Sequence, residues 1–295
     1  MSKEDVQMFS DLLDVLEKRY HDGEIGETEY AELRKNYENR LEQAKKTMLD
    51  LELAPKAISI AGSYKVSEDT IDFSGAAKIS GGKVSRDMKT SGSAKIEGDV
   101  ECNGFQSSGS TKVEGNITAH GPVKGSGSFH CDGDISSEGN ISFSGSTKVE
   151  GKINANGIFT TSGTFHGDSD LNTKRGVRTS GTTHIEGNIS SEGTVELRGL
   201  NKVEGNISAD NVRFISNKPV FLLKKKWKKS FKIEGNIIAR NGIEIEDTEV
   251  KGDIHGRYIK IGPNVKIDGK VLYSDKLDIA NNPKLEHKPE KVNSE

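Results

Sequence analysis

Apolar and polar residues alternate in short runs through the middle of the chain, and a glycine closes each run. Residues 108–197 divide into five successive blocks of eighteen residues, each opening with Ser-Gly. A glycine recurs every six residues from Gly109 to Gly205, with only Ser169 and Arg175 out of step. Because glycine takes a positive φ at little cost, this spacing predicts a corner every six residues. Three corners in eighteen residues make a triangular coil.

The second and fourth residues after each glycine are apolar or small, and they define the expected core. Side chains of a strand alternate between two faces, so both positions face inward together. One inward column contains Ile117, Ile135, Ile153, Leu171, Ile189 and Ile207. A second contains Ile96, Val113, Cys131, Val149, Ile185 and Val203. Where Gly167 interrupts the second column, Phe165 is predicted to fill the vacated space.

The repeat predicts a mainly β fold, a single-stranded parallel β-helix or triangular solenoid. The period shortens to seventeen residues towards both ends, as in residues 74–90 and in the steps from Ile233 to Val250 to Ile267. We expect about 12 coils over residues 58–280, a rod of roughly 55 Å at a strand spacing of about 4.8 Å. No single coil is stable alone, because each shares its core with its neighbours.

Charged residues occupy two adjacent outward columns. One is basic or imidazole and contains Lys95, Lys112, His130, Lys148, His166, His184 and Lys202. The other is acidic and contains Glu97, Glu114, Asp132, Glu150, Asp168, Glu186 and Glu204. We interpret them as a solvated ladder of ion pairs, each of which stabilises the fold only slightly. His166 and His184 beside Asp168 and Glu186 also have a spacing that metal sites use, but the ladder is the favoured interpretation and no metal is predicted.

The N-terminal segment changes to helical periodicity. Apolar residues keep helical spacing on both sides of a break at residues 21–23: Phe9, Leu12, Leu13, Leu16 and Tyr20, then Tyr30, Leu33, Tyr37 and Leu41. Residues 1–54 are therefore predicted to form an α-hairpin, and residues 1–53 carry 14 acidic against 8 basic residues. The segment EKRYHDGEIGETEYAELRKNYENRL resembles short helical-hairpin oligomerisation modules. Capping of the first coil, dimerisation and binding of another protein stay open.

A basic insertion interrupts the solenoid at residues 216–229. The step from Val203 to Ile233 is thirty residues instead of eighteen, so about twelve residues leave the repeat. The predicted contact residues are Phe221, Leu222, Leu223, Lys224, Lys225, Lys226, Trp227, Lys228 and Lys229. Aromatic and apolar groups beside lysines are typical of contact with an anionic membrane surface. Packing within or between molecules is an equal alternative, and nucleic acid is disfavoured because no second basic stripe accompanies it.

Composition narrows the remaining possibilities. Only 32% of residues are hydrophobic and 33 are glycine, which excludes an ordinary globular core but suits a repeat. No apolar run reaches membrane-spanning length and no signal sequence is present, so a cytoplasmic protein is expected. Cys102 and Cys131 are predicted to be buried thiols on different faces. The polar residues 281–295 are predicted to be a disordered tail.

The repeats of form SGSxKVEGNIxA and the closing stretch VKGDIHGRYIKIGPNVKIDGKVLYSDKLDI resemble the bactofilins, polymer-forming cytoskeletal proteins of bacteria and archaea. The likeness covers roughly residues 58–280. It implies a right-handed triangular β-helix that assembles through its terminal coils without nucleotide, often near a membrane. Implied polymer contacts lie near residues 58–73 and at Ile261, Val265, Ile267, Val271, Leu272, Tyr273, Leu277 and Ile279. The added hairpin shifts the expectation towards the C-terminal coils.

Enzymatic alternatives fit the repeat less well. Hexapeptide-repeat acyltransferases place Val or Ile directly before the glycine-like position, whereas Glu114, Glu150 and Glu186 occupy that position here. No Gly-Lys-Ser/Thr phosphate loop follows any glycine. The predicted function is a non-enzymatic structural protein that self-assembles into filaments or a scaffold, without catalytic residues or cofactors. A capped β-helix binding module at a membrane surface is the first alternative, followed by the acyltransferase and a metal-binding enzyme.

Overall fold

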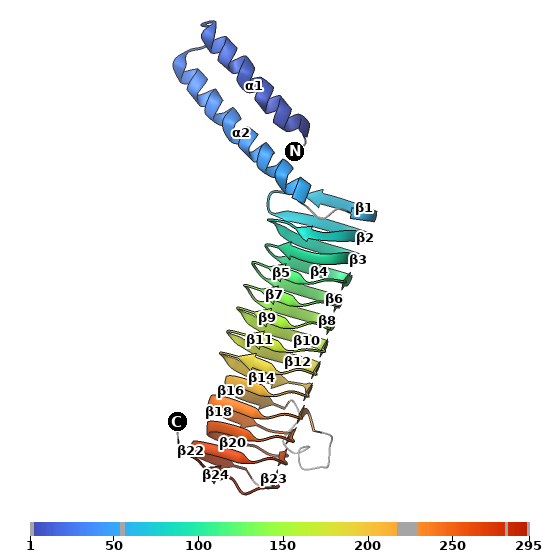
Figure 1. The fold of residues 1–295 in the computed structure, drawn as a ribbon, viewed down its shortest axis with the longest axis vertical. Coiled ribbons are helices and arrows are strands. Elements are labelled where there is room, and N and C mark those ends of the chain that lie inside the picture. The colour runs from blue at the N-terminus through green and yellow to red at the C-terminus, as the bar shows by residue number, and fades with distance from the viewer. Residues whose placement is uncertain (1–2, 54–56, 217–228, 281–282, 294–295) are drawn as a thin grey trace. The chain divides into compact units, whose positions relative to one another are not determined.

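A computed structural model describes residues 3–53, 57–216, 229–280 and 283–293 (Figure 1). The chain divides into two units. One comprises residues 1–55 together with 82–85, and the other comprises residues 56–81 and 86–295.

The N-terminal unit contains the predicted helical hairpin. Helix α1 spans Lys3–His21 and helix α2 spans Glu27–Leu53, joined by a turn in which Gly23 has a φ of 75°. The side chains of Phe9 and Leu16 are buried between the helices' facing sides, and the rings of Tyr20 and Tyr30 stack with their centroids 4.3 Å apart. Glu27 and Glu29 occupy the first turn of α2, where negative charges interact favourably with the positive end of the helix dipole. The predicted hairpin is therefore confirmed.

The second unit is a parallel β-solenoid of about 12 turns, as predicted. In the N-terminal and middle coils a long strand bends at a Ser-Gly dipeptide, and in most of them a short strand completes the coil. The long strands are β2 (Thr70–Lys83), β3 (Asp87–Cys102), β4 (Phe105–Val113), β6 (Val123–Cys131), β8 (Ile141–Val149), β10 (Ile158–Gly167) and β12 (Gly176–Ile185). The short strands are β5 (Ile117–Ala119), β7 (Ile135–Ser137), β9 (Ile153–Ala155), β11 (Leu171–Thr173) and β13 (Ile189–Ser191).

The C-terminal coils distribute their strands differently, because the bend moves to another corner. Their strands are β14 (Thr194–Arg198), β15 (Leu200–Val203), β16 (Ile207–Ile215), β17 (Phe231–Ile233), β18 (Ile237–Ile245), β19 (Thr248–Val250), β20 (Ile254–Ile261), β21 (Lys266–Ile267) and β22 (Val271–Ile279). Val203 of β15 pairs directly with Ile233 of β17, which confirms the thirty-residue step. The ladder therefore continues in register on both sides of the insertion.

The two inward columns are buried as predicted. Ile117, Ile135 and Ile153 lie opposite one another on successive coils and are at most 2% exposed. A Cβ at Gly167 would lie 3.1 Å from the ring of Phe165, so this ring does fill the space that the glycine leaves. The same exchange occurs at Gly125, where a Cβ would lie 2.8 Å from the ring of Phe143. The interior of these coils is consequently a close-packed aromatic and aliphatic stack.

The corner glycines fall into two classes, and the predicted positive φ is right for only one of them. Gly109 of Ser-Gly-Ser has a φ of 98°, and its equivalents Gly127 and Gly145 have φ values of 92° and 98°. Gly115, at the corner after Glu114, is not among the positive-φ glycines. A Cβ on Gly115 would lie 2.4 Å from the carbonyl carbon of Gly98. At this corner glycine is required because the coils stack backbone against backbone.

Both ends of the solenoid depart from the simple repeat. Strand β1 (Ala57–Val66) pairs antiparallel with β2, from Val66 opposite Ile71 to Ala57 opposite Ile79. At the other end the prediction of a disordered tail is wrong for residues 283–293. Strands β23 (Lys284–Leu285) and β24 (Glu290–Lys291) pair with β21 and β22. Backbone hydrogen bonds and the half-buried Leu285 and Val292 order this segment despite its polar composition.

Candidate functional site

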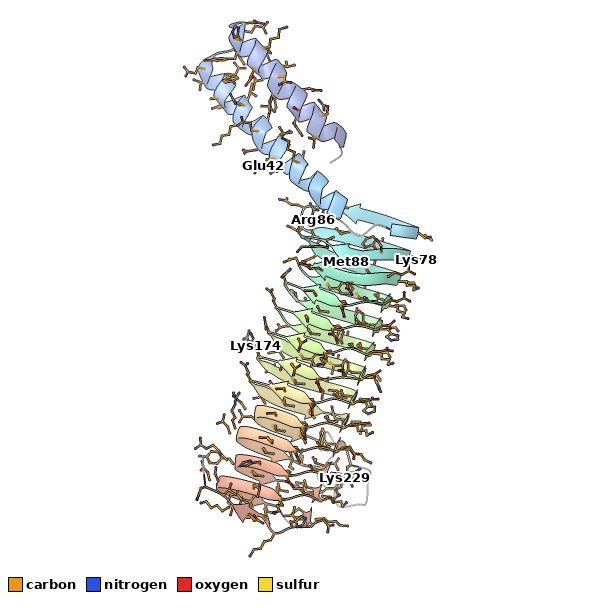
Figure 2. The ribbon with its side chains drawn as sticks, in the orientation of Figure 1. Glu42, Lys78, Arg86, Met88, Lys174 and Lys229 are labelled. Carbon is orange, nitrogen blue, oxygen red and sulfur yellow. The ribbon has the colours of Figure 1, made fainter. Side chains whose placement is uncertain are left out.

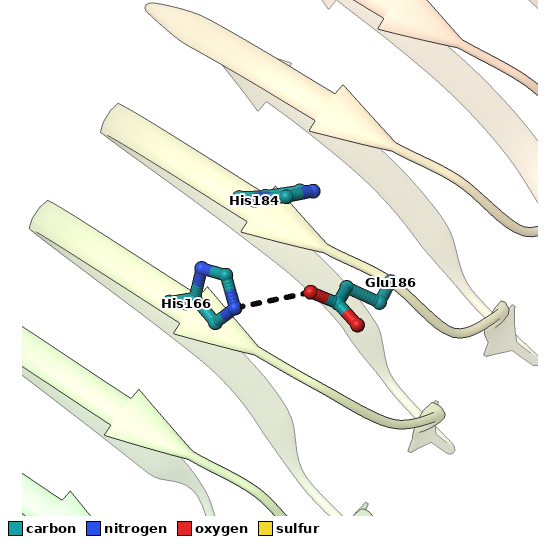
Figure 3. A group of neighbouring side chains, drawn as sticks. All are labelled: His166, His184 and Glu186. Atoms are coloured by element: carbon teal, nitrogen blue, oxygen red, sulfur yellow. Dashed lines mark ion pairs between the residues drawn. The ribbon is translucent and has the colours of Figure 1, made fainter.

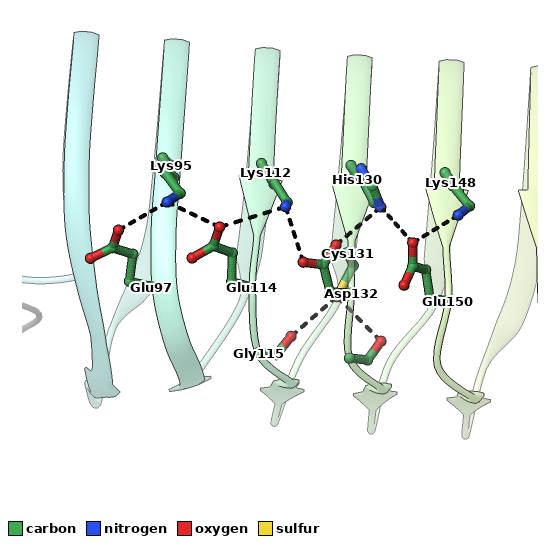
Figure 4. Close-up of polar contacts among 11 residues, drawn as sticks. Lys95, Glu97, Lys112, Glu114, Gly115, His130, Cys131, Asp132, Lys148 and Glu150 are labelled. Carbon is green, nitrogen blue, oxygen red and sulfur yellow. Dashed lines mark hydrogen bonds and ion pairs between the residues drawn. The ribbon is translucent and has the colours of Figure 1, made fainter.

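The two charged columns form a continuous network on one face of the solenoid, here called the charged ladder. Each basic side chain lies just before an inward residue at the end of a strand, and each acidic one lies just after it. Lys95 Nζ is 2.9 Å from Glu97 Oε1 on its own coil and 3.0 Å from Glu114 Oε1 on the next coil (Figure 4). Every base in this part of the ladder therefore bridges two coils.

The histidines replace lysines in the same column and keep the same bridging geometry. His130 Nε2 lies 3.0 Å from Asp132 Oδ1 and 3.2 Å from Glu150 Oε1 (Figure 4). Lys148 continues the ladder with distances of 2.7 Å to Glu150 and 3.2 Å to Asp168. The predicted ladder is thus confirmed as a set of ion pairs between coils.

Mutual charge compensation shifts the pKa values of the ladder in the direction that favours ionisation. Hydrogen bonds from Lys78 and Lys95 lower the pKa of Glu97, and hydrogen bonds to Glu97 and Glu114 raise the pKa of Lys95. Lys148, followed by His130, lowers the pKa of Glu150. These side chains are about one-third to one-half exposed, so water screens the pairs and each pair stabilises the fold only slightly.

A second ladder, which the sequence reasoning missed, follows the corner glycines. The Oδ1 atom of Asp99 accepts a hydrogen bond from the backbone N–H of Asn116 at 2.7 Å, and Asn116 Oδ1 accepts one from the N–H of Asp134 at 2.7 Å. The acceptors in this Asx ladder are Asp99, Asn116, Asp134, Asp170, Asn188, Asn206, Asn236 and Asp253. Lys152 interrupts it and Lys270 ends it. The recurring Gly-Asn or Gly-Asp dipeptide was the available signal.

His120 lies outside both ladders and bridges three coils. Its Nδ1 is 3.0 Å from Glu138 Oε1, and its Nε2 is 3.2 Å from Glu101 Oε1. The hydrogen bond with Glu138, followed by that with Glu101, raises the pKa of His120. When His120 gains a proton as the pH falls, its positive charge therefore lies between the carboxylates of Glu101 and Glu138.

Both cysteines are buried, as predicted. Burial raises the pKa of each thiol to about 12, so both stay protonated at neutral pH. Cys131 Sγ lies 3.4 Å from the carbonyl oxygens of Gly115 and Gly133 (Figure 4). Their chemistry is that of small core residues rather than of nucleophiles.

Of the residues predicted to contact a membrane or partner, only Lys229 lies within the described part of the chain. Its ammonium group donates to the backbone carbonyl and, at 2.5 Å, to the side-chain Oδ1 of Asn264. Figure 2 shows Lys229 beside the C-terminal coils. Residues 221–228 lie outside the described residues, so their predicted contact is not tested by the structure.

The ends of the insertion are held by a buried carboxylate that the sequence did not reveal. Asp247 is fully buried and has a φ of 51°. Its Oδ2 accepts a hydrogen bond from Ser230 Oγ at 2.5 Å and one from Ser216 Oγ at 3.4 Å, and its Oδ1 accepts from Asn264 Nδ2. Ser216 is the first residue of the insertion, and Ser230 directly follows its last residue, Lys229. We call this group, centred on Asp247, the insertion clamp.

The eight predicted polymer-contact residues divide into buried and accessible groups. Four are at most 1% exposed and belong to the core: Ile261, Val265, Ile267 and Val271. Leu272, Tyr273 and Leu277 are half-buried, and Ile279 is 43% exposed. Strand β24 pairs with Leu272 and Tyr273, whereas residues 276–279 pair only with β20 among the described strands. The accessible part of the predicted contact is therefore Leu277 and Ile279.

Two shallow grooves run along the other faces. One has a volume of about 550 Å³ and is lined by small polar residues of β7, β9, β11 and β13. The other has a volume of about 710 Å³ and crosses an outward column that alternates in sign: Arg178, Glu196, Arg213, Glu244, Lys260 and Asp278. Neighbouring charges along this column compensate one another, and Arg175 and Lys276 add two positive charges to the lining of the groove.

Neither of the described helices is long and apolar enough to cross a membrane. Comparisons of the chain with family models, with curated proteins and with solved structures gave no match, so the resemblance to bactofilins rests on the sequence motifs and stays a prediction.

Proposed function

We propose that this chain is a non-enzymatic structural protein that assembles into filaments or a scaffold, without nucleotide, through the ends of its solenoid. The observation that carries the proposal is the parallel ladder, which runs in register through successive coils and ends in strand edges. An unpaired strand edge presents N–H and C=O groups that pair readily with another chain. A second copy is the partner that offers the same strand spacing.

The C-terminal edge offers a small contact. Among the described strands, Leu277 and Ile279 of β22 pair only with Ile259 and Ile261 of β20, so their opposite edge is the candidate for a partner strand. The adjoining tail contains Pro283, Pro289 and several lysines, and its strands β23 and β24 are only two residues long. Such features discourage edge-to-edge pairing, so assembly at this end is confined to the neighbourhood of Leu277 and Ile279.

The N-terminal edge is formed by a longer strand. Strand β1 has ten residues, pairs only with β2 among the described strands, and contains a single lysine, Lys65. Few features along β1 oppose the addition of another strand. The structure thus supports contacts at both ends and favours β1 more than the sequence did.

Negative-stain electron microscopy of the purified chain without nucleotide tests assembly. We expect filaments or bundles whose abundance rises with protein concentration, whereas discrete short particles at every concentration would contradict the proposal. Ile279→Lys places a charge at the C-terminal edge and is expected to reduce assembly. The matched control is Ile238→Lys, since Ile238 is similarly exposed, at 46%, but lies on a lateral face.

The insertion clamp favours a second candidate function, a capped β-helix module that binds an anionic membrane surface. The fully buried Asp247 binds Ser216 and Ser230, so the two points where the chain leaves and rejoins the solenoid are fixed on its surface. Sedimentation with vesicles containing phosphatidylserine, with and without residues 217–228, tests this function. Equal pelleting of both proteins would remove the insertion from that role.

A further inference from the structure

We infer that His166, His184 and Glu186 form a binding site for a borderline transition-metal ion, with Zn²⁺ as the best fit. The two histidines occupy equivalent positions on the paired strands β10 and β12, and Glu186 follows β12 (Figure 3). One potential ligand atom from each residue lies within 4.8 Å of the other two. Two imidazoles with a carboxylate are a ligand set that zinc uses, whereas Mg²⁺ and Ca²⁺ prefer oxygen ligands alone.

The distances suit a single ion. His166 Nε2 lies 3.4 Å from Glu186 Oε1, as shown by the dashed line in Figure 3. Two ligands of a tetrahedral zinc ion are separated by about 3.4 Å when the bonds are about 2.0–2.1 Å long. The ring of His184 meets that of His166 edge-on with centroids 4.7 Å apart. These side chains are about one-third to one-half exposed, so small rotations can bring the third ligand to the same point.

The surroundings favour a cation. Asp168 Oδ1 is 2.6 Å from His166 Nε2, and Glu204 Oε1 is 2.9 Å from His184 Nε2, so a nitrogen that binds the ion exchanges its carboxylate contact for the metal and leaves that carboxylate beside it. The nearest ammonium groups are those of Lys148 and Lys202, which pair with Asp168 at 3.2 Å and with Glu204 at 2.6 Å. With neutral histidines, the three carboxylates therefore exceed the two ammonium groups around the site.

This part of the ladder also departs from the repeat. His166 and His184 occupy successive positions of the basic column, whereas the other histidine in this column, His130, lies between Lys112 and Lys148. The same coil lacks two corner glycines, at Ser169 and Arg175, and has Gly167 in place of a bulky inward residue. The second cluster of possible ligands, His130, Asp132 and Glu150, contains only one imidazole. It provides a matched control.

Isothermal titration of the full chain with ZnCl₂, in a non-coordinating buffer near pH 7.5, tests the site. We expect one Zn²⁺ per chain, and His166→Lys or His184→Lys should weaken binding by about tenfold or more. These variants are expected to fold, since Lys148 and Lys202 already place lysine in this column. His130→Lys should bind as the unchanged protein does.

A second measurement separates a metal site from general attraction to carboxylates. Because the ion would join two coils, Zn²⁺ should raise the thermal unfolding midpoint of the unchanged chain and of His130→Lys, but not of His166→Lys. Absence of saturable binding, or equal loss of binding in His130→Lys and His166→Lys, would overturn the inference.

Discussion

At the scale of single residues, glycine serves two physical purposes that one repeat disguises. Gly109 supplies both a positive φ and the absence of a Cβ, which would lie 2.2 Å from the carbonyl oxygen of Gly92, whereas Gly115 supplies only the absence of a Cβ where two coils stack. The spacing of the glycines could be read from the sequence, and it located the corners correctly. The distinction could not, because it depends on how closely the backbone of one coil approaches that of the next.

The stacking glycines should tolerate no side chain. In Gly115→Ala the Cβ would lie 2.4 Å from backbone of the preceding coil, so the coils must separate locally. Overpacking of this kind costs about 1–3 kcal/mol, which predicts a clear fall in the thermal midpoint followed by circular dichroism. Gly242→Ala is the control, because the nearest atom to its Cβ would be 3.4 Å away. Equal effects of both changes would contradict this explanation.

His120 should make the stability of its coils depend on pH. Its pKa is raised in the folded chain, so its contribution is fully present below the unfolded pKa of about 6.5 and is lost as the pH rises through the folded value. His120→Gln should therefore lower the thermal midpoint more at pH 6 than at pH 8.5. An equal difference at both pH values would show that the bridge to Glu101 and Glu138 does not depend on protonation.

At the scale of elements, the Asx ladder explains how short strands hold their register. Three-residue strands such as β5 and β7 have few hydrogen bonds of their own, and the side-chain acceptors beside each corner add one more per coil. The sequence predicted the buried columns and the charged ladder because their period is visible in residue type. It did not predict the Asx ladder because Asn and Asp are equally common in solvated turns.

Completing the Asx ladder should stabilise the solenoid. The backbone N–H of Lys152 donates a hydrogen bond to Asp134 Oδ1, but the side chain of Lys152 has no acceptor to offer the next coil. Lys152→Asn should add an acceptor for the backbone N–H of Asp170 and stabilise the fold by about 0.5–1.5 kcal/mol, measured by denaturant unfolding. The reverse change, Asn116→Ala, removes the acceptor for Asp134 and should destabilise by a similar amount. No change in either variant would mean that water replaces these bonds without loss.

The insertion clamp should be sensitive to removal of its carboxylate. Asp247→Ala would leave the hydroxyl of Ser230 and the amide of Asn264 without their buried acceptor. Loss of buried partners costs about 1–3 kcal/mol, and the midpoint of thermal unfolding should fall accordingly. Ser216→Ala removes the longer contact to Asp247, of 3.4 Å, and should have the smaller effect. A larger effect of Ser216→Ala would indicate that Asp247 is not the centre of the clamp.

At the scale of the whole solenoid, periodic features were predictable and its ends were not. Burial of the inward columns follows from residue type alone, whereas the antiparallel turn of β1 and the ordered tail depend on which edge is left after the last regular coil. The tail looks polar and disordered in sequence, yet the edges of β21 and β22 provide it with hydrogen-bond partners. The repeat specifies how one coil pairs with the next, so it does not predict which segment pairs with the last coil at each end.

Removal of the tail should promote association. A chain that stops at residue 280 exposes the edge positions now paired with β23 and β24, at Lys266–Ile267 and Leu272–Tyr273. Freed edges attract other strands, so the truncated chain should assemble or aggregate at lower concentration in sedimentation and light scattering. An unchanged or higher threshold concentration would show that the tail does not protect this end.

The direction of the Asx ladder bears on how the protein is made. Asp99 accepts from Asn116, Asn116 accepts from Asp134, and Asp253 accepts from Lys270, so each acceptor precedes its donor along the chain. During synthesis a completed coil therefore already displays the oxygen that the next coil needs when it emerges from the ribosome. The solenoid can therefore grow one coil at a time during synthesis, because each newly made coil donates its hydrogen bond to the coil that has already folded.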